Sequence, residues 1–158
     1  MQEKQKKYIS PDEMRRKIEH YCAYQERCQQ EVRNKLYELG GYTKDIEQLI
    51  AELIEKNFLN EERFAKAYAG GKFRIKHWGK IKIIQALKFR YISDYCIKIA
   101  LRQIDEDDYL LTLQQLIEKK NPNYLHCTPM QKQSIAKYAM SKGFEPNLIW
   151  NVLNKKEK

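Results

Sequence analysis

Apolar residues recur at intervals of three and four positions along most of this chain, which is the spacing of one face of an α-helix. Met14, Ile18 and Cys22 form the first such stripe, and comparable stripes follow in eight further segments up to residue 153. Each segment begins or ends at a residue type that caps or breaks helices. The pattern predicts an all-α protein with nine helices.

Polar and glycine-rich signals between the stripes place the predicted helix ends. Ser10-Pro11 suits the start of a helix to about residue 25, and Gly40-Gly41 suits the end of a second helix over residues 28–39. We expect Thr43 to cap a third helix, to about residue 56, and Asn60 to cap a fourth. The later helices are predicted to follow Trp78-Gly79, Ser93, the acids at 105–108, Thr128-Pro129 and Pro146.

The fourth and fifth helices are each predicted to bury one face. In the fourth helix, the residues expected to face inward are Phe64, Ala67 and Tyr68. In the fifth helix, the buried stripe is Ile83, Ile84 and Leu87. Gly70-Gly71 is expected to loosen the end of the fourth helix, because glycine weakens a helix interior. The stripe of the fifth helix leaves Lys82 and Arg90 to point outward.

The chain also resembles itself at a period near 50 residues. Segments 40–50, 90–100 and 142–152 share an aromatic or aliphatic residue, then a capping position, then an apolar residue three or four places on. Tandem units of this kind bury their apolar faces against one another. We therefore predict three three-helix repeats, at residues 11–58, 59–104 and 105–154, with tails at residues 1–10 and 155–158.

Positive charge is concentrated in the middle of the chain. The net charge is +9, but residues 1–71 sum to zero and residues 103–158 to +1. Residues 72–102 hold nine Lys and Arg against the single Asp94, a net charge of +8. This indicates that the middle repeat faces an acidic protein partner or a nucleic-acid backbone, although a solvated basic face gives the same pattern.

Amino-acid composition excludes several classes of protein and indicates the state of the cysteines. The 6 Gly and 4 Pro are too few for a disordered chain or a turn-rich all-β fold. The N-terminus is polar and no stretch is long and apolar enough to span a membrane, so we expect a cytoplasmic protein. The 4 cysteines form no CxxC pair, and reduced, partly buried thiols are the simplest interpretation.

No catalytic motif is present in the sequence. It has no glycine-rich phosphate loop, no GxSxG elbow and no HExxH pair. His126-Cys127 would need distant partners to bind a metal. The acids at 105–108 could hold Mg²⁺, but acids are ordinary at a helix start because they favour its positive end. We expect no enzymatic activity, no metal and no cofactor.

Aromatic and basic residues alternate at 68–74 and 89–91. Such interleaving can stack bases and contact phosphates, while core packing is the simpler explanation for most of these rings. A helix-turn-helix recognition helix over residues 78–90 is an alternative, but its outward side lacks the Asn, Gln and Arg cluster that reads bases. Phosphate contact is the better nucleic-acid hypothesis.

Residues 58–65 read FLNEERFA, an apolar pair and a capped acidic helix start followed by Arg-Phe-Ala. With the basic-aliphatic helix that follows, the signature positions are Phe58, Leu59, Asn60, Glu61, Arg63, Phe64, Ala65, Gly79, Ile83 and Leu87. Upstream, Arg27-Cys28 with Glu31 and Lys35-Leu36 extends the pattern. In these features, residues 20–153 resemble the RecX family, the bacterial regulators of the RecA recombinase.

Three positions depart from that family pattern. Asn60-Glu61 stands for an acidic pair and Cys28 for a serine, and both changes are expected to preserve or nearly preserve capping and charge. Tyr91 stands where glycine is usual, and a residue with a Cβ resists the positive φ of such a turn.

The resemblance implies an elongated, curved all-α protein that lodges in the groove of a RecA filament on single-stranded DNA. It implies that the protein restrains ATP hydrolysis and strand exchange, and so acts in homologous recombination, DNA repair and the SOS response. A monomer that does not associate with membranes is expected. Charge placement suggests the contact residues Arg74, Lys76, Lys80, Lys82, Lys88 and Arg90. A RecA-independent DNA-binding protein or transcriptional regulator, and an adaptor for another acidic protein, are the alternatives.

Overall fold

The computed structural model describes residues 9–156, so residues 1–8 and 157–158 of the predicted tails lie outside it. The described residues form nine α-helices and one short 3-10 helix, with no strand. The helices are α1 (Pro11–Tyr24), α2 (Gln29–Glu38), α3 (Thr43–Glu55), α4 (Glu61–Lys76), α5 (Lys80–Phe89), α6 (Asp94–Arg102), α7 (Glu106–Lys120), η1 (Tyr124–His126), α8 (Pro129–Ser141) and α9 (Pro146–Leu153). The predicted all-α class is confirmed.

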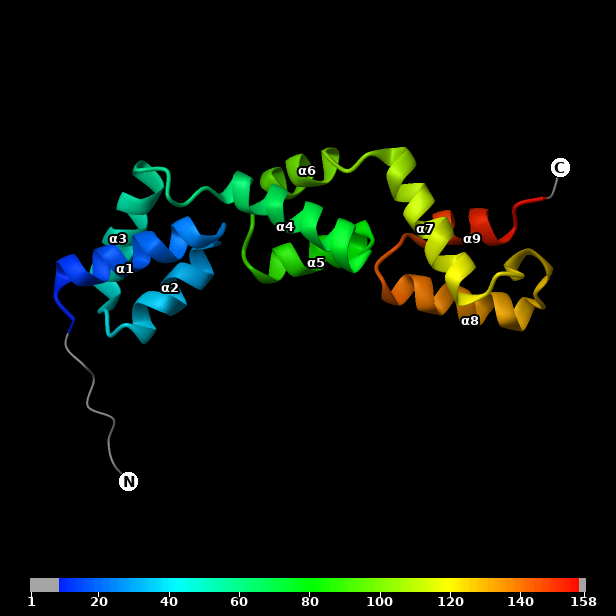
Figure 1. The fold of residues 1–158 in the computed structure, drawn as a ribbon, viewed down its shortest axis with the longest axis horizontal. Helices are drawn as coiled ribbons and strands as arrows, with labels where there is room; N and C mark the ends of the chain where they lie inside the picture. The colour runs from blue at the N-terminus through cyan, green and yellow to red at the C-terminus, as the bar shows by residue number, and fades with distance from the viewer. Residues whose placement is uncertain (1–8, 157–158) are drawn as a thin grey trace, which may run out of the picture.

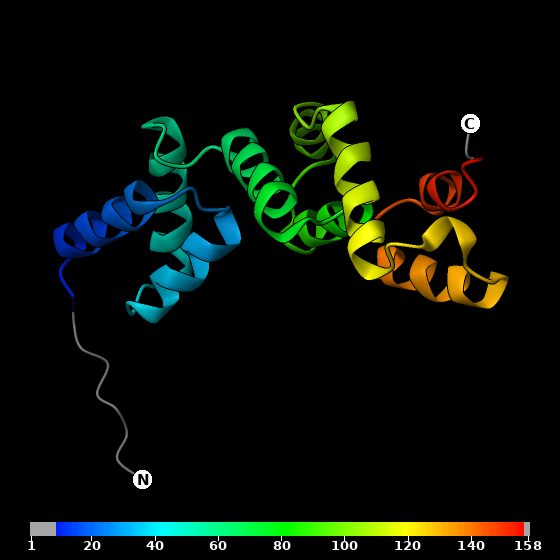
Figure 2. The same cartoon turned by 45° about the vertical axis from the view of Figure 1, so that its right-hand side comes forward.

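The helices are gathered in three groups along the long axis of the molecule (Figure 1). Helices α1–α3 lie at the N-terminal end, α4–α6 in the middle and α7–α9 at the C-terminal end. Each helix packs against another helix of its own group. The turned view keeps the groups in the same order (Figure 2). The predicted elongated, curved arrangement of three-helix repeats is therefore confirmed, and the groups are called the first, second and third repeats below.

The hydrophobic core has two parts. One cluster fills the first repeat, with Ile18 and Leu36 fully buried, and includes Leu59 from the segment before α4. The other cluster runs through the second and third repeats, from Phe64 to Leu153, and takes in Cys28 from the start of α2. The second and third repeats therefore pack as one unit, while the first repeat has a core of its own.

The end of α4 differs from the prediction. The helix continues through Gly70 and Gly71 to Lys76, and it ends where His77 takes a left-handed φ of 56°. Gly70 is buried against the core. Packing of the helix on both sides of the pair outweighs the cost of glycine in a helix, about 1 kcal/mol per residue.

Two further predictions are wrong: the burial of Ala67 and the capping of α3 by Thr43. Ala67 is exposed, whereas Ala65 is fully buried, so the inward face of α4 is rotated from the predicted one. Thr43 does not cap α3, because Tyr42 occupies the N-cap position without a side-chain cap. The Thr43 hydroxyl instead lies 2.9 Å from the Tyr37 hydroxyl, within hydrogen-bond distance.

The cysteines confirm one expectation and correct another. All four are free thiols, and Cys22, Cys28 and Cys96 are buried. Burial raises the pKa of the Cys22 thiol to about 11. Cys28 stands at the N-cap of α2, but its thiol donates to the Glu31 carboxylate at 3.5 Å and makes no cap. Sulfur is a weak acceptor, so the capping expected of this position is not preserved.

Candidate partner interface of the middle repeat

Arg63, a signature position, joins the first repeat to the second. It lies in the first turn of α4, where its backbone N–H donates to the side chain of the capping Asn60 at 2.9 Å. The Arg63 guanidinium pairs with Glu26, which lies between α1 and α2. It also donates to the side chain and the carbonyl of Asn57, at 3.2 and 3.0 Å, beyond the end of α3. One side chain therefore holds two loops of the first repeat.

The other signature residues are mostly buried. Phe58 and Leu59 pack on the core of the first repeat, and the core of the second and third repeats contains Phe64, Ala65, Ile83 and Leu87. The Glu61 carboxylate accepts a hydrogen bond from the Ser93 hydroxyl at 3.2 Å, which links α4 to the start of α6. These residues build the repeats and their connections, so they leave the partner surface to other positions.

The start of α5 meets the turn between α8 and α9 backbone to backbone. The Gly79 N–H donates to the Lys142 carbonyl at 2.7 Å, and the Ile81 N–H donates to the Gly143 carbonyl at 2.9 Å. A Cβ on Gly79 would lie 2.3 Å from the carbonyl carbon of Gly143. The signature glycine is explained by this close approach, because any side chain would force the two repeats apart.

Tyr109 of α7 completes this second junction. Its hydroxyl accepts a hydrogen bond from the Lys80 N–H at 3.0 Å and donates to the Glu145 carboxylate at 2.5 Å. Burial of the phenol, and then its bond to Glu145, raise the pKa of Tyr109. Sequence reasoning missed Tyr109, Glu145 and Gly143, since no local pattern marks residues that meet only when two repeats pack together.

Three of the six predicted contact cations are exposed. Arg74 and Lys76 lie at the end of α4, and Lys88 lies in the last turn of α5. The Arg74 guanidinium folds back toward Gly70, where an added Cβ would lie 2.8 Å from its nitrogens. These three cations are available to a partner in solution.

Lys80 and Lys82 are half-buried, and their ammonium groups lie against the third repeat and, for Lys82, against Trp78. The Lys80 ammonium lies 3.4 Å from the Glu106 carboxylate. The Lys82 ammonium lies 4.7 Å from the centre of the Trp78 ring and 3.5 Å from the Ser141 carbonyl. Both ammonium groups therefore have partners within the protein, and the expectation that Lys82 points freely outward is wrong.

Arg90 is likewise half-buried, so its predicted outward position is also wrong. Its guanidinium donates to the Ala86 carbonyl at 3.0 Å and lies 4.8 Å from the centre of the Tyr68 ring. The Lys72 ammonium lies 5.4 Å from the same ring and 5.0 Å from the Trp78 ring. At residues 68–74, the alternation of aromatic and basic residues thus produces cation–π contacts inside the repeat.

The rings at the end of α5, in the turn after it and at the start of α6 are exposed. Phe89, Tyr91 and Tyr95 are 81%, 79% and 70% exposed. The expectation that most rings of the two aromatic-basic segments belong to the core holds at residues 68–74, where Phe73 is buried and Tyr68 packs against the core, and is wrong at residues 89–91. The three exposed rings at 89–95 adjoin Lys88. From the sequence, the cations Lys88 and Arg90 are the expected contacts of this segment, and core packing is a simpler expectation for Phe89 and Tyr91 than base stacking.

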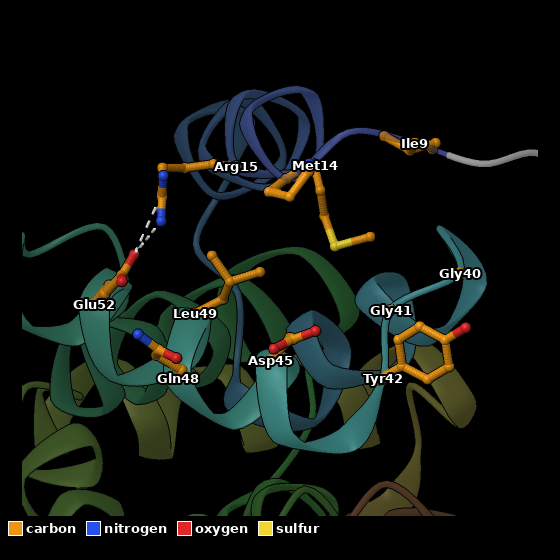
Figure 3. A pocket seen from close by; sticks show the side chains of 11 residues that line it. Ile9, Met14, Arg15, Gly40, Gly41, Tyr42, Asp45, Gln48, Leu49 and Glu52 are labelled. Atoms are coloured by element: carbon orange, nitrogen blue, oxygen red, sulfur yellow. Dashed lines mark hydrogen bonds and ion pairs between the residues drawn. The ribbon is translucent and has the colours of Figure 1, made fainter.

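Two hollows lie in the first repeat, away from these cations and rings. One of about 440 Å³ lies between α1 and α3, with the side chains of Met14 and Leu49 between the two helices (Figure 3). At its edge, Arg15 donates to the Glu52 carboxylate at 3.1 Å. This hollow belongs to the first repeat and holds none of the predicted contact cations.

Two absences among residues 9–156 concern metal binding and membrane insertion. No group of three or more His, Cys, Asp and Glu side chains in that range is placed to hold a metal ion. None of the described helices is long and apolar enough to cross a membrane.

Known proteins resemble this chain in sequence and in structure. Family models of the second and third three-helix domains of RecX match residues 60–101 and 106–153. A curated relative, the regulatory protein RecX of Haemophilus influenzae strain PittGG, is 30% identical over 129 residues, which are 80% of this chain and 84% of that protein. The protein of the same name from Clostridium perfringens strain SM101 is 33% identical over 122 residues, 75% of this chain and 56% of that protein.

A solved structure agrees with these matches at the level of the fold. The crystal structure of RecX from Lactobacillus salivarius superposes with a TM-score of 0.78 at 23% identity, covering 90% of this chain and 93% of that one. The sequence matches and the shared repeat architecture agree with the signature around Phe64. The chain therefore belongs to the RecX family of regulatory proteins.

Proposed function

We propose that this protein is a non-enzymatic regulator that binds RecA filaments on single-stranded DNA and inhibits their ATP hydrolysis and strand exchange. Its place in a family whose curated members are named regulatory proteins supports a regulatory role. The observation that carries the proposal is the row of three bundles (Figure 1) together with the exposed cations of the middle bundle. An elongated basic body can contact several neighbouring subunits, or their DNA, at once.

The second junction supports the same proposal. The second and third repeats share one core and are joined by hydrogen bonds between the backbones at Gly79 and Gly143. Such a unit keeps its contact surfaces at a constant spacing. A constant spacing suits a partner that repeats, because binding at one subunit then brings the next surface into register without further loss of entropy.

The proposal assigns partner contact to Arg74, Lys76 and Lys88, the exposed members of the predicted set. Lys80, Lys82 and Arg90 are assigned to the packing of the second repeat, because each would have to leave an internal partner to reach a phosphate or carboxylate. Exposed cations mainly accelerate association and make it dependent on salt.

The test is the ATPase activity of RecA on single-stranded DNA, measured with increasing amounts of this protein. The wild-type chain is expected to lower the rate, and no effect at saturating concentration would refute the proposal. A triple variant, Arg74→Glu, Lys76→Glu and Lys88→Glu, is expected to need about tenfold more protein for the same inhibition. Its helical circular dichroism is expected to stay unchanged.

A matched variant controls for charge alone. Three exposed lysines of the third repeat and the segment after it, changed as Lys119→Glu, Lys137→Glu and Lys155→Glu, give the same change in net charge. This control is expected to inhibit nearly as well as the wild-type chain. The alternative function, RecA-independent binding of duplex DNA by a transcriptional regulator, predicts tight sequence-selective binding with no effect on RecA.

A further inference from the structure

Three exposed aromatic side chains lie at and on either side of the turn between α5 and α6: Phe89 ends α5, Tyr91 is in the turn and Tyr95 is in the first turn of α6. Phe89, Tyr91 and Tyr95 are each at least 70% exposed and lie within residues 89–95. Aromatic side chains normally contribute 150–250 Å² of buried surface each to a core or an interface. Three that contribute almost none to this fold therefore indicate a surface that is covered by a ligand.

Tyr91 also has a strained backbone, although its exposed side chain adds little to the packing of the protein. It adopts a left-handed φ of 60°, a conformation that favours glycine. Its N–H donates to the Lys88 carbonyl, and the next N–H, of Ile92, donates to Leu87, so Tyr91 occupies the usual glycine position at a helix end. Strain of this kind persists where the residue serves a function other than folding.

Exposed cations continue the surface along α6. Lys88 precedes the rings, and Tyr95, Lys98 and Arg102 occupy one face of α6 at spacings of three and four residues. Asp94 is the exposed acid of this segment. These exposed rings and cations, which follow one another between residues 88 and 102, are called here the turn strip: Lys88, Phe89, Tyr91, Tyr95, Lys98 and Arg102.

The composition of the turn strip favours a nucleic acid over a protein. Bases stack on exposed rings whatever their identity, and phosphates are attracted to the cations beside them. Tyr and Arg are also frequent in protein hot spots, but those lie in well-packed sites whose surroundings exclude water. Here the aliphatic neighbours Ile92 and Ile97 are buried, and Ser93 and Asp94 separate the rings. Bases inside a duplex are already stacked, so the ligand is single-stranded.

We infer that the turn strip is a stacking site for single-stranded nucleic acid, with Tyr91 as its central ring. The inference deepens the proposed function and rests on it for single-stranded DNA as the biological ligand. The binding itself requires no RecA, because every contact comes from this chain.

The test measures binding of the full chain to a fluorescently labelled oligothymidylate by anisotropy, without RecA. Tyr91→Gly is expected to raise the Kd about fivefold or more through loss of one stacked base. The same variant is expected to raise the Tm, because glycine relieves the left-handed backbone. If Tyr91 served folding alone, its replacement by glycine would lower the Tm, and the Kd would rise only because less of the chain is folded. Tyr24→Ala, which removes a ring of the first repeat that is 77% exposed, is the control and is expected to leave the Kd unchanged.

Several outcomes would overturn the inference. One is a wild-type chain that does not bind the oligonucleotide at low salt, and another is an unchanged Kd for Tyr91→Gly. Normal oligonucleotide binding by that variant with lost inhibition of RecA would make the turn strip a protein contact instead. Failure of the proposed function gives a different result, in which the chain does not affect RecA but its oligonucleotide binding still depends on Tyr91.

Discussion

The two junctions between repeats differ in the groups that form them. The first repeat meets the second through side chains: Arg63 reaches Glu26 and Asn57 in two loops, and Cys28 packs into the core of the second repeat. The second repeat meets the third through backbone groups at Gly79 and Gly143, with a continuous core behind them. A side chain can adjust its position, whereas two backbones in contact have no room to move.

The difference indicates which parts of the molecule unfold together. Two core clusters, linked by Arg63 and Cys28, allow the first repeat to open alone, whereas a shared core couples the second repeat to the third. The first junction also holds a buried oxygen, Oε2 of Glu26, that has no hydrogen-bond partner within the described residues. Such a group reduces stability, so the first junction is the weaker one.

Gly143→Ala is expected to have the largest effect, because it acts on the junction that cannot adjust. A Cβ there would lie 2.3 Å from the Lys82 Cβ and 2.6 Å from its backbone nitrogen, at a φ of 95°. We expect a loss of more than about 3 kcal/mol in the free energy of unfolding. Urea denaturation followed by circular dichroism measures it, and a loss below about 1 kcal/mol would show that the junction rearranges.

Gly71→Ala is the matched control for that substitution. Gly71 lies inside α4, and an added Cβ would meet nothing within 4 Å. The free energy of unfolding of this variant is expected to rise by about 0.5–1 kcal/mol, since alanine loses less backbone entropy than glycine in a helix. If the free energy of unfolding falls for Gly143→Ala and rises for Gly71→Ala, the loss at Gly143 is due to close packing and not to the general effect of replacing glycine.

Arg63→Ala is expected to lower the free energy of unfolding by about 1–3 kcal/mol, because it leaves the Glu26 carboxylate without its partner. Hydrogen exchange is expected to accelerate in the first repeat and to stay unchanged in the second and third. Arg33→Ala, which removes a surface pair with Glu47 inside the first repeat, is the control and is expected to cost less than about 1 kcal/mol. Equal acceleration of exchange in all three repeats would contradict the independence of the first.

Alkaline pH is expected to have a smaller effect on the core of the first repeat. Burial raises the pKa of Cys22 to about 11 from an ordinary value of 9.0. Above pH 9 the unfolded chain loses this proton while the folded chain keeps it, so stability falls as the pH rises toward 11. The contribution is fully present below pH 9, and the loss is on the order of 2 kcal/mol.

Unfolding in urea at several pH values between about 8 and 11, under reducing conditions, measures this loss. Cys22→Ala is expected to lower stability at neutral pH by removing a buried side chain, and to flatten the slope above pH 9. Cys28 and Cys96 remain in the variant, so the difference between the two slopes belongs to Cys22 alone. Parallel slopes would mean that another group causes the alkaline loss.

Helix starts were predictable because capping is a local event. The structure confirms side-chain caps at the predicted Ser10, Asn60, Ser93 and Thr128, each accepting from the backbone N–H three residues on. Thr43 misled because its hydroxyl meets Tyr37 instead of the helix. The prediction that Gly70-Gly71 loosens the end of α4 was wrong because packing, which no local signal reveals, keeps these residues helical.

The amino-acid sequence by itself determined the helical class, the three repeats and the family. Apolar spacing, caps and the signature around Phe64 are all properties of neighbouring residues. Only the tertiary structure decided which basic and aromatic side chains are available to a partner. Lys82 packs against Trp78 and the third repeat, while Lys88 and Tyr91 stay exposed at the turn. Exposure depends on contacts between segments far apart in the chain, so no local pattern could separate these residues.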